Sequence, residues 1–181
     1  MRIVGGARKR RQIIPPRNFR ARPTTDFAKE NLFNVLQNQY DLEDVEVLDL
    51  FSGTGSISYE FASRGAKRVV SLEMNPLHQR FIAATAKELG FVQIQSVKTN
   101  VFVYLKSMAG TESFDIVFAD PPYDMDGVET LPELVFEGGF VRDDGIFILE
   151  HSAQKDFSVY PNFYERRSYG SVQFSIFKKE E

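Results

Sequence analysis

The chain has 181 residues, of which 43% are hydrophobic and 26% charged, proportions that are ordinary for a soluble globular domain. It contains no cysteine, which excludes disulfides, thiolate nucleophiles and cysteine-based zinc sites. No apolar run approaches the roughly 18 residues that cross a bilayer, and the first residues lack the apolar core of a secretory signal. These features predict a cytoplasmic protein without a membrane partner, and we expect a monomer that binds no metal.

Charge is distributed unevenly along the chain. Residues 1–25 contain eight Arg or Lys and no acid, which leaves 14 basic and 25 acidic side chains in the other 156 residues, a net charge of −11. A basic segment on an acidic body favours a polyanionic partner, and the alternative is a solvated, partly disordered tail. Pro15, Pro16 and Pro23 exclude a single helix, and Gly5-Gly6 predicts a turn. We therefore divide the chain into a basic arm, residues 1–23, and a domain, residues 24–181.

From Thr24 onwards the pattern is that of alternating helices and strands. An amphipathic helix follows an N-cap at Thr24 or Thr25. Apolar runs predict strands at 45–51, 68–74, 94–100, 114–120 and 145–151, with helices at 56–65, 76–89, 101–109 and 127–140. Residues 163–179 form a final hairpin that turns near Gly170. The sequence predicts an α/β fold with a mostly parallel seven-stranded sheet, helices on both faces and an antiparallel hairpin at one edge.

The loop after the first strand, "DLFSGTG" at 49–55, carries the first functional signal. Gly53 and Gly55 permit a sharp turn close to a ligand, and Glu73 stands 18 residues after Gly55, a spacing that suits a carboxylate on ribose hydroxyls. Ser58 replaces the third glycine of a dinucleotide site, and Asp49 would repel a pyrophosphate but favour a cationic ligand. The pattern therefore favours S-adenosylmethionine (SAM), and the alternative is a structural turn with Glu73 solvated.

Other residues complete the predicted SAM site. Asn100 ends the third strand, where its side-chain oxygen could reach the adenine amino group or could instead cap the following helix. The candidate set of cofactor-binding residues is Asp49, Phe51, Gly53, Thr54, Gly55, Glu73, Met74 and Asn100.

The second signal is "DPPY", Asp120 to Tyr123, at the end of the fourth strand. In a doubly wound sheet this strand lies beside the first, so the motif opens onto the same cleft as the glycine loop. An exocyclic amine of a nucleobase is a poor nucleophile, and two fixed hydrogen-bond acceptors would aim its lone pair at a methyl group. The Asp120 carboxylate and the Pro121 carbonyl could be those acceptors, with Pro122 adding rigidity and Tyr123 a stacking face for a flipped base. The alternative is a rigid turn whose Asp caps the next segment.

These motifs resemble those of a known family. "DPPY" is similar to the amino-methyltransferase signature of class I SAM-dependent methyltransferases. "GGARKRR" (5–11), "RPTTDFAKENLFNVL" (22–36), "DLFSGTGSISYEFASRGA" (49–66) and "DPPY" together resemble the RsmD-like family of bacterial methyltransferases, which act on N2 of a guanine in 16S ribosomal RNA. The resemblance implies a Rossmann-like fold, SAM contacts from the residues named above, and the reacting amine at Asp120–Tyr123. Two departures are Lys9-Arg10-Arg11-Gln12, where the family has a Gly-Arg pair, and Asn100, where an Asp is common.

The basic arm would then contact ribosomal RNA or an assembling small ribosomal subunit through its phosphates. The expected RNA-binding residues are Arg8, Lys9, Arg10, Arg11, Arg20, Arg22, Thr24 and Thr25. Two rival functions remain open at this point. One is an adenine-N6 methyltransferase with the same motif, and the other is a non-catalytic RNA-binding module for assembly.

Overall fold

The computed structural model describes residues 1–19 and 25–179. Their elements run in the order η1 (Gly6–Arg8), α1 (Asp26–Gln39), β1 (Glu46–Asp49), α2 (Ser56–Ser63), β2 (Arg68–Glu73), α3 (Pro76–Leu89), β3 (Ile94–Lys98), α4 (Val101–Ser107), β4 (Phe114–Ala119), η2 (Val128–Thr130), α5 (Leu131–Glu137), β5 (Val141–Ser152), β6 (Phe163–Tyr169) and β7 (Val172–Lys178). Within these ranges, no helix is both long and apolar enough to span a membrane.

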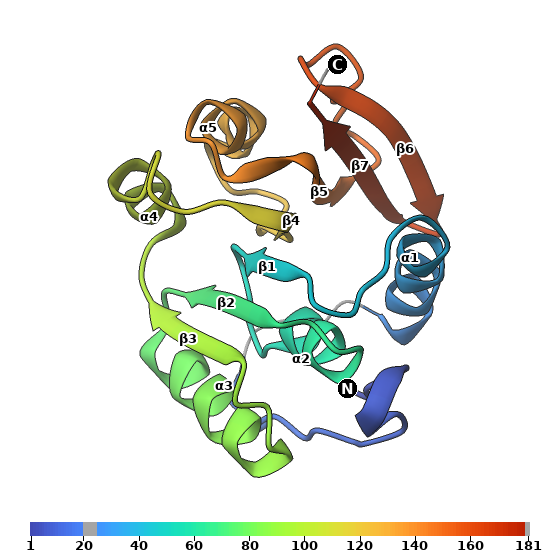
Figure 1. Ribbon diagram of the computed structural model, residues 1–181, viewed down its shortest axis with the longest axis vertical. Coiled ribbons are helices and arrows are strands. Elements are labelled where there is room, and N and C mark those ends of the chain that lie inside the picture. The colour runs from blue at the N-terminus through green and yellow to red at the C-terminus, as the bar shows by residue number, and fades with distance from the viewer. Residues whose placement is uncertain (20–24, 180–181) are drawn as a thin grey trace.

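One seven-stranded sheet in the order β3-β2-β1-β4-β5-β7-β6 forms the centre of the molecule (Figure 1). The first five strands pair in parallel, and β7 pairs antiparallel with both β5 and β6. The predicted sheet, its C-terminal hairpin and the neighbouring position of β1 and β4 are therefore confirmed. The strand order reverses between β1 and β4, which makes their carboxyl ends the expected place for a ligand.

Several predicted elements end one to three residues from their predicted bounds, and two differ by more. The fifth strand begins at Val141 rather than at residue 145, because Val141 pairs with Phe114 across an irregularity and the Arg142 guanidinium bonds Asp115 at 2.8 Å. Polar residues thus continue the strand where the sequence pattern indicated a loop. The helix predicted for 127–140 is split into η2 and α5, since Pro132 favours the first turn of a new helix.

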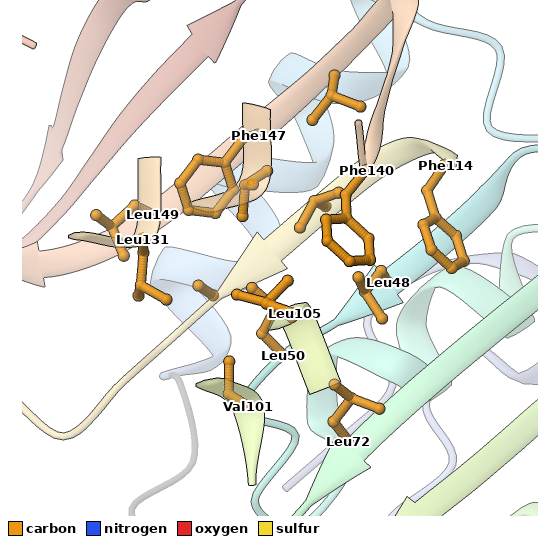
Figure 2. Close-up of a cluster of buried hydrophobic side chains, with 14 of the residues drawn as sticks. Leu48, Leu50, Leu72, Val101, Leu105, Phe114, Leu131, Phe140, Phe147 and Leu149 are labelled. Atoms are coloured by element: carbon orange, nitrogen blue, oxygen red, sulfur yellow. The ribbon is translucent and has the colours of Figure 1, made fainter. Parts of the chain in front are cut away.

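Helices cover both faces of the sheet, as the sequence predicted. In Figure 1, α1, α2 and α3 lie on one side of the strands, and α4 and α5 lie on the other. The α4–α5 side holds the larger apolar cluster, in which Leu105 and Leu131 meet Leu48, Leu50 and Leu72 of the central strands (Figure 2). Burial of such side chains contributes about 1.5–3 kcal/mol each, so both faces hold the strand ends in fixed positions.

The start of the basic arm folds against the body. Met1 to Ile13 form a loop closed by an antiparallel bridge between Arg2 and Gln12, and Ile3 and Ile13 are buried against α2 and α3. The Val4 amide also donates to the buried Glu60 carboxylate of α2 at 2.9 Å. This part of the arm therefore folds onto the domain through its apolar residues, while Gly6–Gln12 between them are exposed.

Candidate active site

The candidate residues converge on one edge of the sheet. Parallel strands β1, β2, β3 and β4 end there, and their carboxyl ends are followed by the glycine loop, by Met74, by Thr99-Asn100 and by Asp120, respectively. Asp49 and Phe118 are register partners across β1 and β4, and Asp120 follows two residues later. Because side chains alternate along a strand, Asp49 and Asp120 lie on the same face of the sheet.

Asp49 is the most deeply placed acid of the site. Its side chain is 1% exposed, and its Oδ2 accepts a hydrogen bond of 2.6 Å from the hydroxyl of Ser58. Its Oδ1 accepts no hydrogen bond from the described residues. Burial raises the pKa of Asp49 to about 6, partly offset by the hydrogen bonds from Ser58 and Ser52 and reinforced by the nearby charge of Glu73. An unsatisfied buried oxygen of this kind fits a cationic or hydrogen-bond-donating ligand group.

Glu73 holds the glycine loop in place. One carboxylate oxygen accepts from the Gly53 amide at 2.9 Å, and the other accepts from the Asn75 amide at 2.7 Å. Gly55 has a φ of +87°, and a Cβ at this position would lie 2.6 Å from the ring of Tyr59, so only glycine fits the turn. Glu73 is half-buried, and each of its oxygens keeps capacity for a further donor such as a ribose hydroxyl.

Four further residues of the predicted SAM set border this region. Thr54 is buried and its hydroxyl lies 3.6 Å from the sulfur of Met1, so the first residue of the arm reaches the glycine loop. Phe51 packs against the α4–α5 core. The Asn100 amide lies 3.7 Å from the sulfur of Met74, whose side chain is 64% exposed.

Of the two roles expected for Asn100, the structure contains the helix cap. Its side-chain oxygen accepts from the amides of Phe102 and Val103 at 2.9 and 3.2 Å, the arrangement of an N-cap for α4. The cap occupies the oxygen that an adenine amino group would need. An adenine contact through this oxygen therefore stays a prediction that competes with the cap.

The Asp120–Tyr123 segment leaves the sheet as a tight turn. Asp120 is half-buried, Pro121 is buried, and Pro122 and Tyr123 are exposed, with Tyr123 at 46%. The turn closes through a 3.0 Å hydrogen bond from the Met125 amide to the Pro122 carbonyl. The Pro121 carbonyl accepts no backbone hydrogen bond in the part of the chain that the structure describes. The two predicted acceptors, the Asp120 carboxylate and the Pro121 carbonyl, thus belong to consecutive residues at the edge of the cleft.

Sequence reasoning missed Glu150, which the structure places beside this turn. Glu150 is 4% exposed near the end of β5, and its Oε1 lies 3.5 Å from the hydroxyl of Tyr123. A shallow crevice brings Pro121, Pro122 and Tyr123 together with Glu150. The signal was available in "FILEH", where an acid interrupts a buried strand, but its neighbour on β4 could not be read from the sequence.

A second set of residues that the sequence did not indicate is the buried ion cluster Lys29, Glu60 and Arg64. The Lys29 ammonium donates to the Arg2 carbonyl at 2.5 Å and to the Ser56 hydroxyl at 3.1 Å, and lies 3.7 Å from Glu60. Burial lowers the pKa of Lys29. This cluster ties the arm and α1 to the first residue of α2, directly after the glycine loop.

The predicted RNA-binding residues lie in more than one place. Arg8 donates to the Leu89 carbonyl at 3.1 Å and Arg11 pairs with Glu88 at 2.8 Å, while Lys9 and Arg10 are exposed. The Arg8 amide also donates to the Ser63 hydroxyl at 2.9 Å. Residues 8–11 therefore lie at the C-terminal ends of α2 and α3, one helix length from the cleft, which is about 12 Å for the eight residues of α2 and about 21 Å for the 14 residues of α3. Thr25 is the N-cap of α1 and accepts from Ala28 at 3.2 Å. Arg20, Arg22 and Thr24 lie outside the described residues.

Comparison with known proteins adds independent evidence. The family model described as "Conserved hypothetical protein 95" matches residues 1–178. The ribosomal RNA small subunit methyltransferase D of Escherichia coli is 27% identical over 183 residues, covering 99% of this chain and 90% of that protein. The structure of the Escherichia coli protein yhhF superposes with a TM-score of 0.84 at 26% identity, covering 99% of this chain and 98% of that chain.

A more distant structure shares the fold alone. RsmC, a 16S rRNA methyltransferase of T. thermophilus in complex with AdoMet and guanosine, superposes with a TM-score of 0.70 at 17% identity, covering 90% of this chain and 45% of that chain. The sheet order, the glycine loop after β1 and these comparisons define the chain as a class I methyltransferase. It belongs to the RsmD family, whose model spans nearly the whole chain.

Proposed function

We propose that this protein transfers a methyl group from SAM to the exocyclic N2 amine of a guanine in small-subunit ribosomal RNA, with S-adenosylhomocysteine and the proton released from the amine as the other products. The observation that carries the proposal is the meeting of two features at one sheet edge. Asp49 and the glycine loop end β1, and Asp120 with the Pro121 carbonyl ends the adjacent strand β4. The names of the relatives support the same substrate class.

The residues around the glycine loop fit SAM. The unsatisfied Oδ1 of Asp49 suits a positively charged amino group, and the Glu73 carboxylate suits ribose hydroxyls. Phe51, Gly53, Thr54, Gly55, Met74 and Asn100 would complete the contacts. When bound, SAM supplies an electrophilic methyl group. A dinucleotide is disfavoured because its pyrophosphate would meet the Asp49 carboxylate.

The Asp120–Tyr123 turn would prepare the nucleophile. The Asp120 carboxylate and the Pro121 carbonyl accept hydrogen bonds from the two N–H groups of the guanine amine and so direct its lone pair toward the methyl group. The two prolines restrict rotation of the backbone that carries both acceptors. The exposed ring of Tyr123 offers a stacking face for a base taken out of its helix, worth about 1–3 kcal/mol.

The basic arm would bind RNA around the target. Residues 8–11 lie one helix length away from the cleft, so they would neutralise phosphates that flank the reacting nucleotide rather than touch its base. Residues 1–23 are in this proposal the RNA-binding extension of the methyltransferase domain 24–181, and a cytoplasmic monomer acting on ribosomal RNA or an assembling subunit stays our prediction.

Methyl transfer from labelled SAM to 30S particles and to protein-free 16S rRNA tests the proposal, with mass spectrometry of the released nucleosides. We expect N2-methylguanosine in a stoichiometric amount at a single position. N6-methyladenosine as the product would favour the rival methyltransferase, and SAM-independent RNA binding without any methylated nucleoside would favour the assembly module. Either outcome would refute guanine methylation.

A further inference from the structure

The carboxylate of Glu150 stands next to the catalytic turn but has no part in the reaction described above. β4 and β5 pair in parallel, with Ala119 opposite Leu149, so Asp120 and Glu150 are the next residues along the two strands. Glu150 lies on the same face of the sheet as Ile148, because side chains alternate along a strand, and continuing the alternation of β4 by one residue puts Asp120 on that face with Phe118. Neighbouring strands lie about 4.8 Å apart, so Asp120 and Glu150 leave the ends of adjacent strands at the same edge of the cleft.

Glu150 lies near the hydroxyl end of the Tyr123 ring. The hydroxyl of Tyr123 lies 3.5 Å from Glu150 Oε1, while the ring of Tyr123 is 46% exposed. A base stacked on this ring therefore presents one edge to Glu150 when its reacting amine lies against Asp120. The two acceptors would face two neighbouring positions of the same purine ring.

Two other polar side chains near the crevice make contacts within the protein. The two ring nitrogens of His151 lie 2.8 Å from the Ser152 carbonyl and 2.7 Å from the Ser175 hydroxyl. The Lys155 ammonium bonds the Glu129 carboxylate. Neither residue is placed to read a base, whereas Glu150 lies beside the hydroxyl of Tyr123.

Guanine and adenine differ at the atom next to the amine. In guanine, N2 is bonded to C2. The ring nitrogen N1, which is next to C2, carries a hydrogen and is a hydrogen-bond donor. In adenine, the carbon that bears N6 is also beside N1, but that nitrogen is an acceptor. A carboxylate accepts a hydrogen bond from the guanine N1–H and repels the adenine N1 lone pair.

Given the methyl transfer proposed above, on which this inference rests, we propose that Glu150 determines the specificity for guanine. Its carboxylate accepts the hydrogen bond from N1–H while Asp120 and the Pro121 carbonyl accept from the N2 amine. The four-residue motif prepares an amine of either purine, and Glu150 selects the one that has a donor beside it. The residue that distinguishes guanine from adenine would then lie on β5, outside the Asp120–Tyr123 motif.

The test uses an RNA fragment spanning the guanine found in the methylation experiment, synthesised with either guanine or 2-aminopurine at that position. 2-Aminopurine keeps the reacting amine but has an acceptor at N1. We expect the natural protein to prefer guanine by at least ~100-fold in kcat/KM, because a site built to bond a donor rejects an analogue that lacks it. Glu150→Gln should narrow the preference to below ~10-fold, since its carboxamide can also donate to an N1 acceptor.

Two further variants separate recognition from folding. Glu150→Asp keeps the carboxylate and should lower the rate while retaining the preference for guanine. Glu133→Gln removes an exposed acid of α5 and should change neither rate nor preference. Circular dichroism and SAM calorimetry verify that each variant folds and binds the cofactor. If Glu150→Gln does not fold, the Glu150→Asp variant serves as the test. Loss of the preference for guanine over 2-aminopurine in that variant would contradict the role of the carboxylate.

The outcomes distinguish this inference from the function on which it rests. A natural protein that methylates neither RNA refutes the proposed function. A natural protein that methylates guanine and 2-aminopurine equally well, or a Glu150→Gln variant that loses the same factor with both, refutes the role of Glu150 and leaves the function intact. A selective change in the ratio establishes it.

Discussion

The two sides of the cleft differ in how deeply their polar groups are buried. On the cofactor side, Asp49 and Thr54 are 1% and 3% exposed, and Glu73 bonds two backbone amides. On the base side, Pro122 and Tyr123 project from a loop and are exposed. A small ligand can be enclosed by a site built in advance, whereas a base in a large polymer needs an open face. The difference therefore matches the sizes of the two proposed substrates.

The buried ion cluster of Lys29, Glu60 and Arg64 lies next to the cofactor side of the cleft. Glu60 is fully buried, accepts from the Val4 amide and pairs with Lys29 and Arg64. Through these contacts the arm, α1 and α2 are joined close to Ser56. We expect the buried side of the cleft to depend on these ion pairs for its stability, and the exposed side to carry out the methyl transfer.

The largest expected effect is on stability. Lys29→Met removes one member of the buried cluster and leaves Glu60 with less compensation, so the free energy of unfolding should fall by about 3–5 kcal/mol. Urea denaturation followed by circular dichroism measures the change. Lys179→Met, which breaks an exposed ion pair of 2.8 Å with Asp143, is the matched control and should leave the transition unchanged. Equal decreases in the free energy of unfolding would show that the buried cluster contributes no more to stability than the exposed ion pair.

Asp120→Ala should lower the methyl-transfer rate at least ~100-fold, because one of the two acceptors for the amine is lost. SAM affinity should be nearly unchanged, since Asp120 lies on the base side. Single-turnover kinetics and calorimetry measure the two quantities. Asp124→Ala, which removes an exposed acid of the same loop, should retain the rate. Unchanged turnover of the Asp120 variant would remove it from the mechanism.

The affinity for SAM should depend on pH through Asp49. Its pKa is raised to about 6, so without ligand the stability contributed by this group is lost as the pH rises through 6. A cationic group of a bound ligand stabilises the ionised form of Asp49, so SAM should bind more tightly when Asp49 is ionised. We expect SAM to bind ~10-fold more weakly at pH 5 than at pH 7.5, because a group with a pKa near 6 is about one-tenth ionised at pH 5.

Calorimetry across this pH range measures that dependence. Asp49→Asn should bind SAM weakly at every pH, without the slope. A natural protein with a flat profile would show that the carboxylate does not face the charge of the ligand.

The smallest effect is expected from the arm. Lys9→Gln with Arg10→Gln removes two exposed charges and should weaken RNA binding severalfold, lowering the slope of log affinity against log salt by about 1.5. The control pair, Lys106→Gln with Lys179→Gln, removes the same charge from α4 and from the residue after β7, away from the contacts of the arm with α2 and α3. Fluorescence anisotropy at several salt concentrations compares them. Identical slopes would show that binding depends on net charge alone.

Several parts of the fold could be predicted from local sequence. α3 begins at Pro76 and ends at Leu89, as predicted, because Asn75 accepts from the amides of Leu77 and His78 and Gly90 ends the helix with a φ of +74°. The hairpin turn near Gly170 has the same origin. Caps and turns act over a few residues, so their signals lie side by side in the chain.

The candidate site was predicted unevenly. The glycine loop, Glu73 and the Asp120–Tyr123 turn are local motifs, and the structure places them at one edge. Whether Asn100 caps a helix could not be decided from the sequence, because both roles use the same oxygen. Glu150 was missed because its significance depends on its neighbour across β4 and β5.

The sequence by itself determined the order of strands and helices, the two motifs of the cleft and the family they resemble, because each depends on the chemistry and spacing of nearby residues. Only the tertiary structure decided which groups are buried and which meet. Lys29 becomes a buried cation because three distant segments converge on it, and Glu150 becomes a neighbour of Asp120 through strand pairing. Burial and pairing arise from contacts between segments far apart in the chain, which no local pattern records.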